Sequence, residues 1–148
     1  MTDDGSSETI LLDVFHTNQV RERLIATAME GLELPPEDYP FYVIIGAEGP
    51  WTPTALAARL EMPLSTVLFR VRRLEKRGHA ERTPNPDDRR SYLVELSPDG
   101  QKLLGKARPR FRSLALAVQE RLGDERVSGL RGGLGELREA IESELNPE

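Results

Sequence analysis

The sequence predicts a mainly helical protein of the α+β class, in which one β-hairpin interrupts a succession of helices. Over most of the 148 residues, apolar side chains recur every three or four positions, which is the period of amphipathic helices. Between residues 79 and 96 they alternate instead, on either side of a segment rich in turn-forming residues. Proline and glycine separate the segments. We therefore expect four helices, a hairpin and two further helices, in that order.

Two helices are expected before residue 48. A long amphipathic helix covers residues 8–32, because its apolar positions keep helical spacing as far as Gly31 and the following double proline. Residues 37–47 form a short and very apolar stretch. A short buried helix suits this stretch, although residues 42–45 taken alone also suit a strand.

Two short helices joined by a tight turn follow. Thr52 supplies a capping side chain and Pro53 suits the first helical position, so the first of these helices begins here. The second covers residues 64–77 and ends at Gly78. We expect its apolar face to carry Leu64, Val67, Leu68, Val71 and Leu74. We expect the opposite face to carry Ser65, Thr66, Phe69, Arg70, Arg72, Arg73, Lys76 and Arg77.

The hairpin and the last two helices complete the chain. Residues 79–83 and 91–96 have strand-like alternation around a turn rich in proline and aspartate. The pair Ser97-Pro98 starts a helix by the same cap-then-proline pattern. Residues 127–141 have near-heptad apolar spacing but contain four glycines, so we expect this last helix to need a partner surface.

Composition excludes several classes of protein and site. The chain has no cysteine and only two histidines, which excludes disulfides and thiolate chemistry and argues against a zinc site. No apolar run approaches the roughly 18 residues of a membrane span. The start of the chain is acidic and polar, so we expect a cytoplasmic protein with no membrane partner. No glycine-rich phosphate loop or nucleophile motif is present, so we expect neither an enzyme nor a cofactor.

Charge is unevenly distributed along the chain. The net charge is −5, yet nine basic and five acidic residues lie between positions 59 and 90. A basic middle between acidic flanks is typical of a module that faces phosphate groups. A solvated helix face that happens to be rich in arginine is the alternative.

Two short helices followed by a hairpin are the parts of a winged helix-turn-helix, whose second helix enters the major groove of DNA. Ser65 and Thr66 are small donors in the first turn of that helix. Arg70 and Arg73 lie a turn further along, and we expect one of them to read a guanine edge. A winged helix that binds an acidic protein partner is the competing interpretation.

The tip of the hairpin contains Asp88, Arg89 and Arg90. An arginine at this position can enter the minor groove or grip the backbone, and Asp88 can brace it through a charge-assisted hydrogen bond. An exposed turn with a weak surface ion pair is the alternative.

The middle of the chain resembles the MarR family of bacterial regulators. The resemblance covers about residues 51–104 and rests on TALAARLEMPLSTV from Thr54, RRLEKRGHAER from Arg72 and PDDRRSYLVELSPDG from Pro86. It implies DNA contact by Ser65, Thr66 and the exposed arginines of residues 64–77, Arg72 among them. It also implies a wing signature formed by Asp88 and Arg90.

The same resemblance implies a homodimeric transcription regulator, a repressor in the simplest case, that binds an inverted-repeat operator on double-stranded DNA. It divides the chain into an N-terminal dimerisation helix at 1–35, a winged helix-turn-helix at 36–96 and C-terminal dimerisation helices at 97–148. In this arrangement the helices 8–32 and 98–143 of two chains interleave.

Two positions depart from the pattern of the family. Leu68 and Phe69 stand where relatives often have a hydroxyl residue and a polar or basic residue. We expect Leu68 to lie in the core. Phe69 either touches a thymine methyl group or packs against the neighbouring helix.

Many relatives bind a small aromatic or phenolic effector in a cleft between the dimer helices and the winged module. The resemblance implies that such a cleft would be lined here by Phe15, His16, Tyr42, Trp51, Phe111 and Arg112. Core packing is the alternative for each aromatic residue, and a surface or interface position is the alternative for His16. A constitutive regulator without an effector therefore remains an alternative interpretation.

Overall fold

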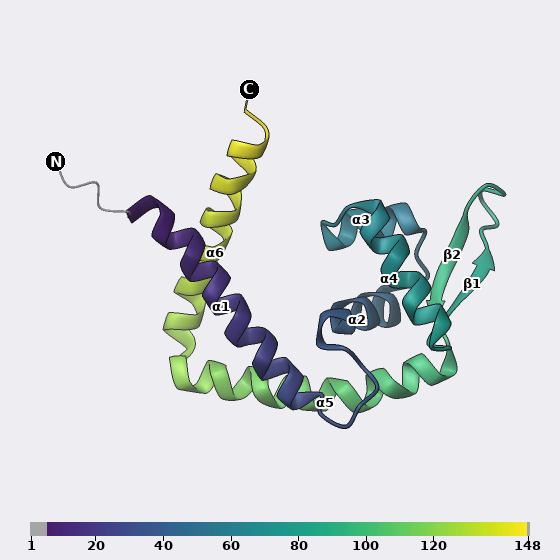
Figure 1. The fold of residues 1–148 in the computed structure, drawn as a ribbon, viewed down its shortest axis with the longest axis horizontal. Helices are drawn as coiled ribbons and strands as arrows, with labels where there is room; N and C mark the ends of the chain where they lie inside the picture. The colour runs from purple at the N-terminus through teal and green to yellow at the C-terminus, as the bar shows by residue number, and fades with distance from the viewer. Residues whose placement is uncertain (1–5, 148) are drawn as a thin grey trace. The chain divides into compact units, whose positions relative to one another are not determined.

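The computed structural model describes residues 6–147, which form six α-helices, one 3-10 helix and one two-stranded antiparallel sheet (Figure 1). The elements are α1 Ser6–Ala28, η1 Pro36–Asp38, α2 Tyr39–Glu48, α3 Pro53–Leu60, α4 Leu64–Lys76, β1 Ala80–Pro84, β2 Tyr92–Leu96, α5 Pro98–Leu122 and α6 Asp124–Leu145. The chain divides into two compact units between Arg110 and Phe111, within α5. The predicted order of helices and hairpin is confirmed.

The core of the first unit lies among α2, α3, α4, β2 and the first turns of α5. The apolar stretch after the double proline is the helix α2, so the alternative of a strand at residues 42–45 is wrong. Burying a large apolar side chain contributes about 1.5–3 kcal/mol, and several are completely buried here. These are Phe41, Tyr42, Leu56, Val67, Val71, Leu74 and Val94.

The turn between α3 and α4 is built as the sequence predicts. The Thr52 hydroxyl accepts a hydrogen bond of 3.2 Å from the Ala55 N–H and caps α3. Glu61 ends α3 in the left-handed region with φ of 53°, and the Met62 N–H then donates to the Ala57 carbonyl at 3.1 Å. These bonds reverse the chain within a few residues, so that α4 begins directly after α3.

The buried stripe of α4 is narrower than the sequence predicts. Val67, Val71 and Leu74 are completely buried, whereas Leu68 is half-buried. Leu64 is 43% exposed, so its expected place on the apolar face is wrong. The reason is that α4 begins at Leu64, one turn before the first residue that reaches the core.

The hairpin forms the wing of the first unit. β1 and β2 pair antiparallel, with Ala80 opposite Leu96 at the base. Trp51 extends the sheet by one residue, because it exchanges backbone hydrogen bonds of 3.1 and 2.7 Å with Val94. Its indole N–H donates to the Ile44 carbonyl of α2 at 3.1 Å. The sheet is therefore fastened to α2 along β2, while in residues 6–147 the outer edge of β1 has no strand beside it.

The start of α5 packs closely against the residue that precedes β1. The Ser97 hydroxyl accepts a hydrogen bond of 3.1 Å from the Gly100 N–H and caps the helix. A Cβ atom at Gly100 would lie 2.2 Å from the carbonyl oxygen of His79, so only glycine allows this approach. Further along α5, the Arg110 guanidinium donates to the carbonyls of Ala28 and Glu30 at 3.2 and 2.8 Å. Arg110 thus caps the end of α1, four residues before the predicted end.

Two helices keep apolar side chains exposed. In α1, Ile25 is buried near the C-terminal end, but Leu11 and Phe15 are more than half exposed. In α6 no residue is buried, and Leu130 and Leu134 are 53% and 60% exposed. Apolar stripes of this length are unusual on the surface of a monomer.

Candidate nucleic-acid interface

The outward face of α4 carries the side chains that are available to a ligand. Ser65, Phe69, Arg72 and Lys76 are exposed and follow one another at helical spacing, opposite the buried stripe. Thr66 is half-buried beside them. This face contains a hydroxyl, an aromatic ring and two cations, which is a mixture suited to base edges and phosphates.

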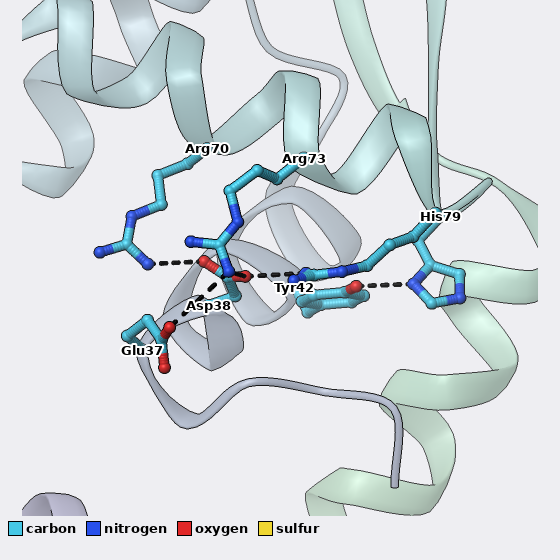
Figure 2. A network of polar contacts seen from close by, with 7 residues as sticks. Glu37, Asp38, Tyr42, Arg70, Arg73 and His79 are labelled. Carbon is cyan, nitrogen blue, oxygen red and sulfur yellow. Dashed lines mark hydrogen bonds and ion pairs between the residues drawn. The ribbon is translucent and has the colours of Figure 1, made fainter.

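A second face of α4 is turned inward, towards a buried carboxylate. Asp38 of η1 is completely buried and accepts a hydrogen bond of 2.7 Å from Arg70. Its other oxygen accepts one of 2.8 Å from Arg77 and lies 3.6 Å from Arg73. Arg73 also lies 3.7 Å from Glu37. Figure 2 shows Arg70 and Arg73 reaching from α4 towards Asp38.

This arrangement corrects the expected orientation of two arginines. Arg70 and Arg73 were placed on the exposed side of the helix, but their side chains are only 22% and 32% exposed and both pair with Asp38. Positions 70, 73 and 77 form a stripe on one flank of the buried stripe, which brings all three guanidinium groups to η1. Burial lowers the pKa of Arg77, but the hydrogen bonds to Asp38 and Tyr42 outweigh it and raise the pKa overall.

Asp38 is a residue that sequence reasoning missed. Its three partners lie between 32 and 39 positions away. The one local signal is the spacing of the arginines along α4, and that spacing is equally compatible with a solvated face. A buried carboxylate with several arginine partners is costly to expose, so the network fixes η1 against α4.

Next to this network, the Tyr42 hydroxyl makes a buried hydrogen bond of 2.7 Å with Nδ1 of His79. Figure 2 shows this contact beside the arginine network. Both side chains are buried, and Tyr42 is inaccessible to solvent. Tyr42 was one of the residues expected to line an effector cleft. The structure instead shows it packed in the core.

The wing tip is held by backbone contacts. The Asp88 carboxylate accepts a hydrogen bond of 2.9 Å from the backbone N–H of Arg90, and its carbonyl accepts one of 3.1 Å from Ser91. Asn85 holds the other side of the turn by accepting from the Asp87 N–H at 3.0 Å. Asp88 thus braces the backbone of Arg90. The sequence predicts instead that Asp88 braces the guanidinium group of an arginine. The guanidinium groups of Arg89 and Arg90 are exposed.

A side chain of the wing also contacts α4. Arg82 of β1 lies 4.3 Å from the centre of the Tyr92 ring and donates a hydrogen bond of 2.6 Å to Glu75. The hydrogen bond to Glu75 raises the pKa of Arg82. Sequence reasoning missed this contact, although strand alternation places residues 82 and 92 on the same face of the hairpin.

The basic residues of the middle of the chain therefore fall into two groups. Arg59 pairs with Glu48, three arginines pair with Asp38, and Arg82 pairs with Glu75. Within residues 6–147, four basic side chains between positions 59 and 90 have no acidic partner. These are Arg72 and Lys76 on α4 and Arg89 and Arg90 at the wing tip.

The other residues expected around an effector belong to both units of the chain. Phe15 and His16 are exposed neighbours on α1, with ring centres 5.7 Å apart, and Trp51 is fixed to α2 and β2. Phe111 and Arg112 belong to the second unit. A shallow depression of about 420 Å³ is present in the first unit, and none of the six expected residues lines it. Its lining residues are Leu32, Glu33, Leu34, Pro35 and Arg77.

No helix within residues 6–147 is both long and apolar enough to cross a membrane. In the same part of the chain, no group of three or more histidine, aspartate or glutamate side chains is arranged to hold a metal ion.

The sequence is similar to those of known proteins. A sequence model of the MarR family matches residues 43–92, which span α2 to the first residue of β2. The chain is 33% identical over 101 residues to the multiple antibiotic resistance protein MarR of Salmonella typhimurium, which covers 67% of this chain and 70% of that protein. The corresponding protein of Escherichia coli is 30% identical over the same lengths.

Solved structures have the same fold. A probable transcriptional regulator from Pseudomonas aeruginosa has a TM-score of 0.79 and 30% identity, over 88% of this chain and 98% of its own. A mutant of Escherichia coli MarR complexed with operator DNA has a TM-score of 0.81 and 24% identity, over 92% and 99%. The fold and the site therefore define a winged helix-turn-helix regulator of transcription that binds DNA. Within that class, the chain belongs to the MarR family.

Proposed function

We propose that two copies of this chain form a cytoplasmic homodimer that represses transcription by occupying an inverted-repeat operator. The observation that carries the proposal is the grouping of unpaired cations. Arg72 and Lys76 lie on the outward face of α4, and Arg89 and Arg90 lie at the wing tip. One helix in a major groove and a wing beside it would bring all four to phosphates or base edges.

Contacts to DNA are then assigned by exposure. Ser65, Thr66, Phe69 and Arg72 would face the base edges, while Lys76, Arg89 and Arg90 would hold phosphates. The N-terminus of α4 would face a phosphate, since no side chain of the described residues caps that end. Arg70 and Arg73 would act indirectly, because Asp38 holds both guanidinium groups at η1.

The dimer is supported by the apolar stripes of α1 and α6. No residue of α6 is buried, and α6 exposes Leu130, Leu134, Ile141 and Leu145 at helical spacing, while α1 exposes Leu11, Phe15 and other apolar side chains. A helix with these side chains gains its stability mainly from a partner surface, and a second copy supplies an identical one. Two-fold symmetry of the protein would then require a two-fold symmetric site on the DNA.

Related structures support occupancy of DNA by such a fold. Escherichia coli MarR was solved with operator DNA, and the repressor CouR was solved bound to a 23-mer duplex. Release by a small aromatic effector is a further proposal, and it rests on the resemblance alone. A rise in melting temperature with phenolic compounds would support an effector, and no rise with any of them would favour a constitutive regulator.

The test is selection of binding sites from a random duplex library, followed by titration of the selected site at two salt concentrations. We expect an inverted repeat with half-sites about one helical turn apart, bound by one dimer. Each neutralised phosphate should steepen the salt dependence by about 0.9 in the logarithmic slope. Failure to enrich any sequence would contradict the proposal and would favour the winged helix as a surface for an acidic protein.

A further inference from the structure

Phe69 is the large apolar side chain in the middle of the outward face of α4. It is 59% exposed, and the packing of α4 is provided by Val67, Val71 and Leu74, each completely buried. The possibility that Phe69 packs against the neighbouring helix is therefore wrong. A single exposed apolar side chain is common on protein surfaces, so the place of Phe69 among the polar residues of this face has to carry the argument.

The ring of Phe69 is held by a side chain that is itself anchored. The Arg73 guanidinium lies 5.8 Å from the ring centre, within the range of a cation–π contact. Arg73 in turn lies 3.6 Å from the buried Asp38 and 3.7 Å from Glu37. A buried carboxylate, a guanidinium and the aromatic ring thus form a line from η1 to the outer face of α4. These contacts place an anchored guanidinium beside the ring.

The surroundings of the ring indicate what it would meet. Ser65 lies one turn before Phe69, and Arg72 and Lys76 lie one and two turns after it, on the same exposed face. The apolar ring therefore lies between a hydroxyl group and two cations. This arrangement is complementary to a surface that is acidic overall and presents an isolated apolar group. In the major groove of DNA that group is the C5-methyl of thymine.

We propose that Phe69 reads a thymine methyl group in each half-site of the operator, with Arg73 acting as the positioning residue for its ring. This inference rests on the proposed function and adds to it the base that the helix prefers. Arg73 is a positioning residue because its guanidinium contacts the ring and the carboxylates of Asp38 and Glu37.

The experiment replaces each thymine of the selected site by deoxyuridine, which lacks the methyl group and keeps the base-pairing edge. We expect one symmetry-related pair of thymines at which replacement weakens binding about fourfold per half-site and about 15-fold in both. Fourfold corresponds to about 0.8 kcal/mol, the transfer free energy of one buried CH₂ group. The Phe69→Ala variant should bind the thymine and deoxyuridine sites equally.

Lys76→Ala is the matched control. It lies on the same face as Phe69, and it should weaken binding to both sites while keeping their ratio. Arg73→Ala should lower the ratio without abolishing binding, and Arg73→Lys should restore it only in part, because an ammonium group lacks the planar shape of a guanidinium.

The outcomes separate the two proposals. If the wild-type protein binds a selected site but deoxyuridine changes its affinity nowhere, Phe69 does not read a methyl group and the repressor proposal stands. If deoxyuridine at one pair of thymines lowers the affinity of the wild-type protein and lowers that of Phe69→Ala by the same factor, another residue reads the methyl group. The inference is then overturned. If no site is selected, both proposals fail. Because Phe69 is exposed, we expect its alanine variant to fold. The comparison of thymine and deoxyuridine sites with the wild-type protein needs no variant at all.

Discussion

Asp38 and Arg70 form an ion pair of 2.7 Å between η1 and α4, and the Asp38 carboxylate is completely inaccessible to solvent. Arg77 makes a second pair of 2.8 Å with the other carboxylate oxygen. A single buried anion therefore holds two strongly bonded guanidinium groups, with a third at 3.6 Å. The inward flank of α4 is fixed by these contacts, and its outward face is left to the ligand.

Replacing Asp38 by alanine should lower the free energy of unfolding by about 2–4 kcal/mol. Removing one partner of a buried ion pair leaves the other charges uncompensated, and the partial exposure of the arginines keeps the cost below the upper end of the usual range. Urea titration would measure the loss. Glu37→Ala is the control, because Glu37 is exposed and makes one long pair with Arg73, so its loss should stay within about 0.5 kcal/mol. Equal losses for the two variants would contradict the central place of Asp38.

Arg70→Ala and Arg72→Ala should have opposite signatures. Arg70 pairs with Asp38, so its removal should reduce stability and leave the sequence preference of binding unchanged. Arg72 is exposed, so its removal should leave stability unchanged, weaken binding and relax the preference at one base pair by about 1–3 kcal/mol. Thermal unfolding and titration of single-base variants of the selected site measure both effects. A changed sequence preference in Arg70→Ala would show that the Arg70 guanidinium releases Asp38 when the protein binds DNA.

Asp88→Ala should weaken binding to all sequences alike. Asp88 fixes the backbone of Arg90 by a hydrogen bond of 2.9 Å, so its loss should loosen the wing tip. Removing an acidic side chain also reduces repulsion from phosphate, and Asp87→Ala controls for this because it removes the same charge beside the same turn. We expect Asp87→Ala to bind as well as the wild-type protein or better, and Asp88→Ala to bind worse. Two variants that bind equally would show that the turn does not depend on Asp88.

Tyr42→Phe should cost about 1–2 kcal/mol of stability near neutral pH, because it leaves Nδ1 of the buried His79 without its partner. Burial raises the pKa of Tyr42 above its ordinary value of about 10, which the unfolded chain keeps. The folded protein therefore retains this proton to higher pH than the unfolded chain does. The resulting stability is fully present below pH of about 10 and is lost as pH rises towards the folded pKa.

Urea titrations at several pH values test that linkage. The difference in unfolding free energy between the wild-type protein and Tyr42→Phe should be constant at pH 7–9 and should shrink above pH of about 10. A difference that stays constant up to pH 11 would show that Tyr42 titrates alike in both states.

Leu134→Glu should shift the protein towards monomer. Leu134 is 60% exposed in the single chain and lies on the apolar stripe of α6, so a charge there would have to be buried in a dimer. Sedimentation velocity over a concentration series would measure the change. Ser128→Glu adds the same charge on α6, away from the leucine stripe, and should leave the assembly unchanged. Identical profiles for all three proteins would remove α6 from the proposed interface.

The order of elements could be predicted because its signals are local. Thr52 and Ser97 each cap a helix that starts with proline, and Gly78 ends α4 with a positive φ of 77°. Such signals act within four residues, so they survive any tertiary arrangement. The position of Leu64 could not be predicted in this way, because helical spacing assigns a face but not the residue at which a helix first meets the core.

The candidate site was harder to predict for a related reason. Spacing along α4 separates the buried stripe from the rest, but a flanking residue such as Arg70 faces either water or a neighbouring element. Here η1 supplies the buried Asp38, 32 positions earlier in the chain, and no local pattern indicates that partner. Phe69 shows the converse, since two environments were possible for its ring and the exposed fraction excludes one of them.

The outer edge of β1 bears on how the wing avoids pairing with other strands. Among residues 6–147, a two-stranded sheet fastened along β2 by Trp51 still offers one unpaired edge, and unpaired edges tend to join other strands. Here that edge carries Glu81 and Arg82 and ends at Pro84, which has no N–H to donate. Charge and proline both discourage edge-to-edge pairing with another strand. The same short strand that supports the wing tip thus carries the features that disfavour strand addition at its outer edge.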